Sequence, residues 1–466
     1  MNQFVRVGSG TNMVGSLWKR RIGLLGVGLL ATVLVACGGT GDDSTSPTVD
    51  DPSNEATAVV AAPDPTETPV PTTAPEIEQE PTSTPVDVVE NTKEELDFSD
   101  LFSDDAEKSR VATLQKIWGW KTNFEERTIP LTELSIVLAK DKITPVDNPT
   151  FVSVADAPAY MESREPVVAL IVEGDARAYP LAILMWHEIV NDTVGGEPVT
   201  VTFCPLCNTG ITFSRIIDGQ ELTFGTSGML RNSDLVMWDR QSESFWQQIT
   251  GEALAGDFAA NESVLSQLPS SIIAWETFAE AYPEGKLLER VVDDRGLLAR
   301  PYDSPPYAGY DDVDAHPFLF QGSVDDRLIA TSRVLTIDGE IPVAYPFAFL
   351  KEAPVINDSI NDSPITAFFD YGTFSAFNSL SNEHQTSGSV AVFSRIVGDR
   401  LLTFEANDHG ITDIETGSAW NYAGIATSGE LEGTQLEPVV HANHFWFAWA
   451  VFKPATQIRD SLDDLG

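Results

Sequence analysis

The sequence predicts an α+β protein whose folded part consists of two tandem, related halves, each a small β-sheet with flanking helices, packed together. Two observations lead to this prediction. The second part of the chain repeats motifs of the first part in the same order, and short segments rich in β-branched residues alternate with segments of helical apolar spacing. From the N-terminus, we divide the chain into residues 1–36, 37–95, 96–330 and 331–466.

Residues 1–36 have the features of a secretory signal peptide. A basic cluster at 19–21 precedes a mostly apolar run at 22–36, which is shorter than the roughly 20 residues of a membrane-spanning helix. The run ends in Leu-Val-Ala before Cys37, which resembles a lipobox. We therefore expect Cys37 to carry a lipid that anchors the protein to the cell membrane outside the cytoplasm. An ordinary membrane anchor and a non-lipidated signal are the alternatives.

Residues 37–95 are expected to form a disordered, acidic tether. The segment is dense in Thr, Pro, Ser, Asp and Glu and shows no apolar periodicity. Such a composition buries too little apolar surface to offset the entropy lost on ordering.

The charge balance limits the possible partners. The chain has 28 basic and 70 acidic residues, a formal charge of −42, and the signal holds only basic charges. A field of this sign disfavours nucleic acid and anionic lipid headgroups, and suits solubility or divalent cations. A solvated acidic surface is its ordinary interpretation.

An internal repeat divides the rest of the chain into a first half, 96–330, and a second, degenerate half, 331–466. Matching residues follow one another in the same order, with only two shifts of register. The pairs include Ala178-Tyr179-Pro180 with Ala344-Tyr345-Pro346, Phe213-Ser214-Arg215 with Phe393-Ser394-Arg395, Asp234 with Asp408, Asp239 with Asp413, and Trp246 with Trp420.

Each half is predicted to combine short strands with short helices. Apolar spacing indicates a helix at 179–189, and β-branched residues indicate a strand at 199–203. Further strands are expected at 210–215 and 221–225, and aromatic-rich helices at 272–282 and 444–452. The connection at 295–326 is too long for a turn, and Tyr302, Tyr307 and Tyr310 suggest that it lies against the core.

Cys204 and Cys207 form the most specific motif, Cys-Pro-Leu-Cys, at the tip of a predicted β-hairpin. Two thiols at this spacing allow a redox dithiol, a metal site with mixed ligands, or a structural disulfide. Their repeat partners are Asp370 and Thr373, so one chain cannot supply four cysteines to a closed zinc site.

His187 and Arg231 are the predicted neighbours of the thiols. His187 corresponds to Ala353 and Arg231 to Glu405, so these residues and the cysteines are lost together in the second half. Either could tune a thiolate, although a packed histidine and a salt-bridged arginine are ordinary alternatives. Arg240, which corresponds to Ile414, is a similar candidate.

Other possible ligands are less specific. Met185, Met229 and Met237 could add thioethers for copper(I), but core packing is the more common fate of methionine. His441 and His444 are spaced so that they could share a metal, but no acidic motif accompanies them. Asp234, Asp239 and Trp246 reappear in the half that lacks thiols, which indicates a structural role.

Five motifs resemble the bacterial and archaeal family called domain of unknown function 3179, over about Arg110 to Arg459. The resemblance implies no assigned activity, but some members carry selenocysteine in the Cys-Pro-x-Cys motif, which implies redox chemistry at the position of Cys204. Asn208 departs from the family, in which we expect glycine. The motifs are Ala-Tyr-Pro-Leu at 178–181, Phe-Cys-Pro-Leu-Cys-Asn-Thr at 203–209, Ser-Gly-Met-Leu-Arg-Asn-Ser-Asp at 227–234, Pro-Tyr-Ala-Gly-Tyr-Asp-Asp at 306–312 and His-Phe-Trp-Phe-Ala-Trp at 444–449.

The leading functional expectation is a surface-anchored thiol–disulfide protein that acts on an unknown redox partner or substrate. In it Cys204 attacks, Cys207 resolves, and His187 and Arg231 tune the thiolate. One alternative is a non-enzymatic lipoprotein that binds copper or zinc through Cys204, Cys207 and His187, with Met229 as a candidate further ligand. The other is a structural or adhesive surface module.

Overall fold

The computed structural model describes residues 104–312, 316–378, 384–408 and 410–466. The signal peptide, Cys37 and the tether lie outside these residues. The described chain is mostly β-sheet, arranged in several small sheets with few helices, which agrees with an α+β or mainly β fold. Among its helices, none has the length and apolar character to span a bilayer.

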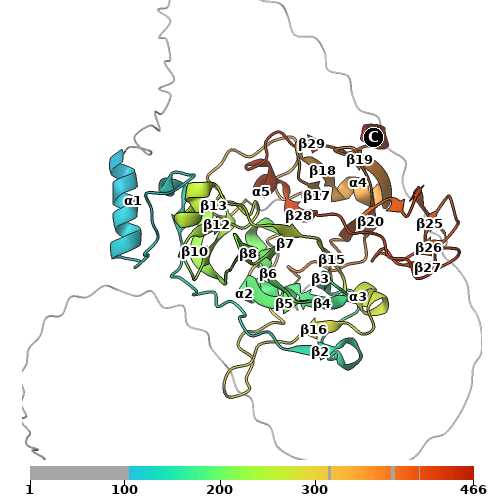
Figure 1. Ribbon diagram of the computed structural model, residues 1–466, viewed down its shortest axis with the longest axis horizontal. Coiled ribbons are helices and arrows are strands. Elements are labelled where there is room, and N and C mark those ends of the chain that lie inside the picture. The colour runs from blue at the N-terminus through green and yellow to red at the C-terminus, as the bar shows by residue number, and fades with distance from the viewer. Residues whose placement is uncertain (1–103, 313–315, 379–383, 409) are drawn as a thin grey trace, which may run out of the picture. The chain divides into compact units, whose positions relative to one another are not determined.

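The first region, residues 135–288, contains three main sheets (Figure 1). They have the strand orders β15-β3-β4-β16-β2, β14-β7-β6-β5 and β1-β10-β11-β12-β13. The strands are β1 Ser135–Ile136, β2 Phe151–Ser153, β3 Pro166–Val172, β4 Asp175–Pro180, β5 Ile189–Val194, β6 Glu197–Cys204, β7 Thr209–Ser214, β10 Phe224–Arg231, β11 Asp234–Asp239, β12 Phe245–Gln247, β13 Ala253–Ala255, β14 Gln267–Leu268, β15 Ser270–Ala274 and β16 Lys286–Leu288, with the small hairpin β8 Ile216–Ile217 and β9 Gln220–Glu221.

The second region, residues 333–458, also contains three main sheets. Their strand orders are β28-β17-β18-β29, β19-β20-β21 and β24-β25-β26-β27. The strands are β17 Arg333–Ile337, β18 Val343–Pro346, β19 Val355–Ile360, β20 Ser363–Asp370, β21 Ser389–Ser394, β24 Phe404–Asn407, β25 Gly410–Asp413, β26 Ala419–Trp420, β27 Ala426–Ser428, β28 Ala442–Phe445 and β29 Gln457–Ile458, with the small hairpin β22 Ile396–Val397 and β23 Arg400–Leu401.

The helices are short and begin where apolar strands end. Pro180 and Pro346 precede α2 and α4, where a missing N–H costs nothing because the first turn of a helix has no acceptor for it. The helices are α1 Asp104–Lys116, α2 Leu181–His187, α3 Trp275–Ala281, α4 Phe347–Glu352 and α5 Trp446–Ala450.

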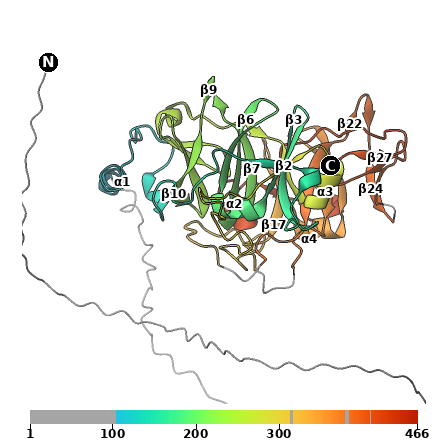
Figure 2. The ribbon, with the colours of Figure 1, turned by 90° about the horizontal axis from the view of Figure 1, so that it is seen from below.

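The two regions pack directly against each other (Figures 1 and 2). Strand β15 of the first region contacts β21 of the second, and β28 of the second contacts β7 of the first. Across this junction Thr209 Oγ1 lies 2.7 Å from His444 Nδ1, and the Gln267 amide donates to the carbonyl of His441 at 3.2 Å. The β6–β7 hairpin is therefore supported by both regions.

Several predicted element boundaries are wrong in the same way. The expected helix at 179–189 loses Tyr179 to β4, and the helix expected at 272–282 gives up its first residues to β15. The helix at 444–452 likewise starts only after β28. In each case a short apolar strand runs straight into a short helix, and periodicity over so few residues does not separate the two. The strand expected at 221–225 is divided between β9 and β10.

The connection at 295–326 packs on the core as the sequence predicts. Tyr302 is 3% exposed, and Tyr307 and Tyr310 contact the large hydrophobic cluster that contains both cysteines. The described residues of this connection form neither a helix nor a strand.

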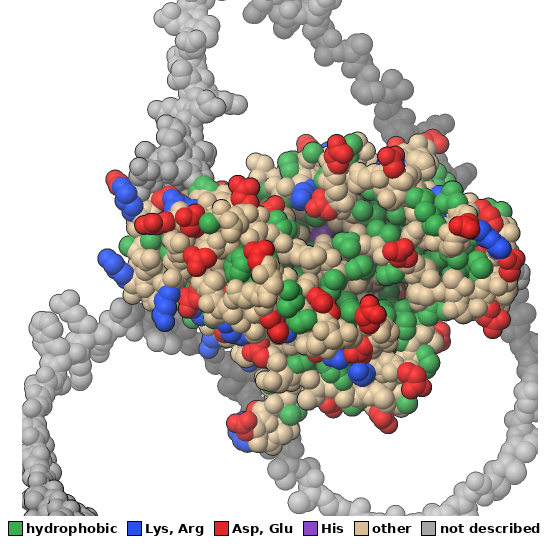
Figure 3. Space-filling model, viewed as in Figure 1, with side chains coloured by type: hydrophobic (Ala, Val, Ile, Leu, Met, Phe, Trp, Pro, Cys, Tyr) green, Lys and Arg blue, Asp and Glu red, His purple; other side chains and the backbone are tan. Residues whose placement is uncertain are grey.

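The surface is dominated by acidic and neutral side chains. In the view of Figure 3, acidic groups outnumber basic ones, and hydrophobic side chains gather near the junction of β15 and β21. A hollow at that junction is lined by Ile171, Ile273, Ala391 and Phe393.

Candidate functional site

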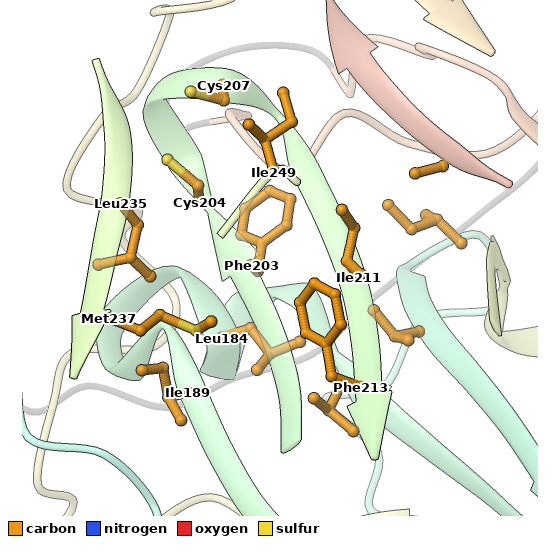
Figure 4. Packing of buried hydrophobic residues seen from close by; sticks show 14 of the residues in the cluster. Leu184, Ile189, Phe203, Cys204, Cys207, Ile211, Phe213, Leu235, Met237 and Ile249 are labelled. Atoms are coloured by element: carbon orange, nitrogen blue, oxygen red, sulfur yellow. The ribbon is translucent and has the colours of Figure 1, made fainter. Parts of the chain in front are cut away.

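The two thiols lie at the turn between β6 and β7. Cys204 is the last residue of β6, and Pro205–Cys207 forms one 3-10 turn. Asn208 then takes a left-handed conformation, with φ 51°, before β7 begins at Thr209. This turn places both sulfur atoms on the same side of the hairpin, facing the strand that carries Leu235 (Figure 4). The predicted hairpin tip is therefore correct, and both thiols are free.

A third side chain, Asp234, completes a cluster with the thiols. Asn232 and Ser233, both with positive φ, form the two-residue turn between β10 and β11, so Asp234 starts β11 pointing inward. One ligand atom from each of Cys204, Cys207 and Asp234 lies within 4.8 Å of the other two. Spacing of this order allows all three to reach one metal ion.

The Asp234 carboxylate is held by one oxygen only. Its Oδ2 atom accepts hydrogen bonds from the Gln247 amide at 2.5 Å and from the backbone N–H of Ile249 at 3.0 Å. Its Oδ1 atom is buried and has no nitrogen or oxygen partner among the described residues, and the two thiols are the polar groups beside the carboxylate. A thiol is a weak hydrogen-bond donor and compensates a buried carboxylate poorly, so an ion or a water molecule is the expected occupant beside it.

Glu188 adds a second buried acid near this cluster. It follows α2 in a left-handed conformation, with φ 59°, and is 7% exposed. Its carboxylate interacts electrostatically with Asp234 and with Cys204. A non-glycine residue with positive φ is uncommon and is often found at functional sites.

Burial and like charge raise every acid pKa in the site. Burial raises the pKa of Asp234 to about 6, and burial followed by the Asp234 charge raises the pKa of Glu188 to about 8. Burial also raises the pKa of the Cys204 thiol and, further, that of Cys207. In the described part of the chain, none of these four groups forms a hydrogen bond or an ion pair with a basic side chain. The pocket therefore favours neutral thiols until a cation enters.

The site is sealed rather than open to solvent. Cys204 is 1% exposed, and Cys207 and Asp234 are 0% exposed. The 295–326 connection covers it. Burial raises the pKa of Tyr307 and Tyr310 of this connection, and both lie close enough to the cysteines for charge there to raise it further. The connection is attached there by a hydrogen bond from the Ser233 hydroxyl to the carbonyl of Phe318. The thiols are therefore closed off from solvent, because the tyrosine-rich connection packs over them.

His187 does not lie with the thiols, although the sequence predicts that it does. Its Nδ1 atom is 2.7 Å from the carbonyl oxygen of Thr144, and its Nε2 atom is 2.8 Å from the hydroxyl of Tyr302. Both ring nitrogens are therefore in use, and the cluster that could hold a metal does not include this residue. Burial lowers the pKa of His187, so its ring is neutral near pH 7.

Arg231 reaches the cluster only through another residue. Its Nε atom donates to Glu133 at 2.6 Å, and its Nη1 atom donates to Gln247, which in turn holds Asp234. Glu133 already neutralises its charge, so Arg231 positions the carboxylate rather than lowering a thiol pKa. Arg240 is also paired, with Asp141 and Asp147.

The remaining candidate ligands are dispersed. Met237 lies beside Leu184 and Ile189, away from the sulfurs (Figure 4), and Met229 belongs to a different hydrophobic cluster. The His441 ring bonds the Val439 carbonyl at 2.7 Å, and His444 stacks on a tryptophan. The structure therefore does not assemble these residues with the cysteines.

Asp234 and Glu188 are the site residues that sequence reasoning missed. Asp234 was assigned a structural role because Asp408 occupies its repeat position. Asp408, however, is exposed, whereas Asp234 is buried against the thiols. Glu188 did carry a signal, because it sits next to His187 and its repeat position is Pro354.

Two cysteine sulfurs and one carboxylate within 4.8 Å of one another are a donor set for a divalent metal. Sulfur and oxygen donors together suit zinc, whereas copper(I) prefers sulfur alone. Three protein ligands would leave a fourth zinc position for water.

Comparison with known proteins identifies one family. A family model described as "Protein of unknown function (DUF3179)" matches residues 140–456. This range contains every residue of the site and most of the described chain. A search of curated proteins and a search of solved structures gave no match.

Proposed function

This chain belongs to the DUF3179 family, and we propose that it is a lipid-anchored, extracytoplasmic protein that binds one zinc ion through Cys204, Cys207 and Asp234. The single observation that carries the proposal is the uncompensated acidity of this buried cluster. Two thiols and two carboxyl groups gather in the interior, and their polar contacts include no basic side chain of the described residues.

A divalent ion resolves this electrostatic problem. Burying an ionised carboxylate or thiolate without a counter-charge is strongly unfavourable, which is why each pKa is raised. A bound Zn²⁺ deprotonates coordinating thiols and supplies the missing positive charge. The free Asp234 Oδ1 atom becomes a ligand, while Oδ2 keeps the hydrogen bonds that orient it.

The redox function predicted from the motif has less support. A reactive thiol needs an exposed, electropositive surrounding that stabilises the thiolate. Here the thiols are sealed, their pKa values are raised, and His187 and Arg231 are engaged elsewhere. A dithiol that exchanges with a partner would require the covering connection to open.

The metal content of the protein tests the proposal. Protein purified without chelator should contain about one zinc per chain by elemental analysis. Cys207→Ser and Asp234→Asn should reduce this content at least tenfold, because each removes a ligand. Asp408→Asn is the matched control, since it changes the repeat partner of Asp234 and should leave the zinc unchanged.

Two results would overturn zinc binding. One is a metal-free wild-type protein whose circular dichroism shows an intact fold and which takes up no added zinc. The other is reversible conversion of Cys204 and Cys207 to a disulfide at physiological potentials, measured by alkylation and mass spectrometry. That second result would restore the redox function.

The proposal includes a lipid on Cys37 and a tether at 37–95, both outside the described residues. Its support is the signal-like segment that ends in a lipobox-like sequence. Labelling of cells with a fatty acid should tag the wild-type chain and not Cys37→Ser. Labelling of both, or of neither, would contradict lipid anchoring.

We also propose that the two regions are copies of one unit. Supporting this, β15-β3-β4-β16 and β28-β17-β18-β29 have matching order, each with one parallel pair. The junction contacts are reciprocal as well: β15 with β21, and β28 with β7. Such exchange of equivalent surfaces is typical of a two-fold arrangement. Zinc binding would then belong to one copy, and the other would serve as its support.

A further inference from the structure

A second cavity lies beside α2 and does not include the cysteines. Its volume is about 180 Å³, and it is bounded by residues around 160–165, the start of α2, residues 290–305 and residues 374–378. A cavity of roughly 150 Å³ is large enough for benzene, so this one accepts a compact organic molecule.

Aromatic rings form much of its wall. Tyr160, Tyr302 and Phe374 all line the cavity, together with the apolar side chain of Ile183. Such walls favour the apolar part of a ligand, and aromatic faces attract a cation. The cavity has a partly open rim, since Tyr160 is 36% exposed.

His187 holds one of these rings in place. The Thr144 carbonyl can only accept a hydrogen bond, so His187 Nδ1 carries the proton, and Nε2 accepts from the Tyr302 hydroxyl at 2.8 Å. This arrangement gives the histidine a positioning role: it fixes the Tyr302 ring in the cavity wall.

The positive charge of Arg290, which lines the cavity, is already paired with an acid. Arg290 stacks over Tyr160, with its Cζ atom 3.7 Å from the ring centre, and forms an ion pair with Asp303. Its charge is therefore neutralised and its position fixed, and it is a poor attractor for an anionic ligand.

The carboxylate of Glu165, by contrast, is not paired. Glu165 is partly buried, and its carboxylate forms no hydrogen bond or ion pair with the described part of the chain. Burial and the nearby Glu162 raise its pKa, and the opposing effects of His384 and Arg290, which also line the cavity, do not offset that rise. In the described chain, the ion pair of Glu162 is with His384, which also lines the cavity, at 4.0 Å.

We infer that this cavity binds a small organic ammonium ion, with the ammonium on Glu165 and the hydrocarbon part against Tyr160, Tyr302 and Phe374. The inference does not depend on zinc binding, because none of the zinc ligands lines the cavity. An anion would face Glu165 and an already paired arginine, and a neutral molecule would leave the carboxylate unbalanced.

Calorimetry with three molecules of the same carbon skeleton tests the inference on the full chain. The probes are 3,3-dimethylbutylamine, 3,3-dimethylbutan-1-ol and 3,3-dimethylbutanoate. The amine should bind at least tenfold more tightly than the alcohol, and the carboxylate should not bind, because a charge-assisted bond to Glu165 is available only to the amine.

Variants identify the carboxylate. Glu165→Gln should weaken amine binding at least tenfold, whereas the matched control Glu280→Gln, an exposed glutamate outside the cavity, should not. His187→Gln should weaken it less, and Asp234→Asn should leave it unchanged. Equal binding of amine and alcohol, or equal behaviour of the two glutamate variants, would overturn the inference. A wild-type protein that binds the amine but neither contains nor takes up zinc would contradict only the zinc proposal.

Discussion

The first region has a sheet of order β15-β3-β4-β16, and the second region has a matching sheet of order β28-β17-β18-β29. The two regions differ in the connection between the strands β6 and β7 and the corresponding strands β20 and β21. In the first region β6 turns through Pro205–Cys207 directly into β7, and two thiols occupy the turn. In the second region β20 ends at Asp370, and β21 begins only at Ser389. The second region therefore has a longer connection at the place where the first region has the cysteine turn, although the two regions share a sheet order.

What the two regions share is a set of buried hydrogen bonds. Tyr179 donates to Asp192 at 2.6 Å in one region, and Tyr345 donates to Asp358 at 2.5 Å in the other. The indole N–H of Trp246 bonds Asp239 at 3.0 Å, and that of Trp420 bonds Asp413 at 3.0 Å. Paired polar groups of this kind maintain a fold, since removing one partner leaves the other buried without a bond.

What the regions do not share indicates function. Cys204, Cys207 and Asp234 form one cluster, with which Glu188 interacts electrostatically, and the counterparts of the four residues are Asp370, Thr373, Asp408 and Pro354. The Thr373 hydroxyl bonds Ser389 at 2.7 Å and the Asp370 carboxylate at 3.3 Å, so Asp370 and Thr373 are engaged in local hydrogen bonds of the second region. The difference shows that sequence retention alone misassigns Asp234, because the same residue type lies in two different environments.

The largest expected difference between the regions is the response to metal. Zinc at a thousandfold excess over its dissociation constant should stabilise the protein by about 4 kcal/mol, because ligand binds only the folded state. Thermal unfolding with added zinc and with chelator measures this effect. Cys207→Ser should abolish the response and Asp408→Asn should retain it. A zinc response that survives in Cys207→Ser would place the metal elsewhere.

The second largest expected effect is the loss of stability on removal of Asp239 or Asp413, the aspartates that accept the indole N–H of Trp246 and Trp420. Asp239→Ala and Asp413→Ala should each lower the free energy of unfolding by about 3 kcal/mol, because each leaves a buried indole N–H and a backbone N–H without an acceptor. Urea unfolding gives the two values. Values that differ by more than a factor of two would show that the regions do not use these bonds alike.

A smaller effect is expected at the paired tyrosines. Tyr179→Phe and Tyr345→Phe should each cost about 1.5 kcal/mol, since each removes one hydrogen bond to a charged group. The Asp358 side chain is 0% exposed and Asp192 is 8% exposed, so the cost should be greater at Tyr345. Urea unfolding of both variants provides the test, and a larger cost at Tyr179 would contradict the burial argument.

The smallest expected effect is a loss of stability at acid pH that is confined to the first region. Burial raises the pKa of Asp175, but hydrogen bonds from Arg177, Lys286 and the N–H of Gly195 outweigh it and lower the pKa to about 2. Its folded pKa is depressed, so its contribution is present above the unfolded pKa of about 3.9 and is lost as pH falls towards 2.

Because Asp175 is partly exposed, that contribution should be at most about 1 kcal/mol. Hydrogen exchange of β3 and β4 at pH 5 and pH 3 measures it, with Asp175→Asn as the variant that removes the change. The second region has Ile341 at this position, so β17 and β18 should show no such change. An equal change of hydrogen exchange in both regions would show that Asp175 is not its cause.

Much of the fold follows from local sequence. The strand at 199–203 and the hairpin tip at the cysteines were predictable, because β-branched residues run up to a Pro-containing turn. The packing of Tyr302, Tyr307 and Tyr310 was also predictable from their apolar rings in a long connection. Strand–helix junctions such as Ala274 to Trp275 were not, since both elements are short and apolar throughout.

The sequence by itself determined which elements form and where the two thiols sit along the chain, because strand, turn and helix preferences depend on near neighbours. Only the tertiary structure decided what surrounds those thiols. Asp234 reaches them from a different sheet, Glu188 from the end of α2, and the covering tyrosines from the long connection. Contacts between residues so far apart in the chain depend on how sheets pack, and burial, charge balance and metal preference all follow from that packing.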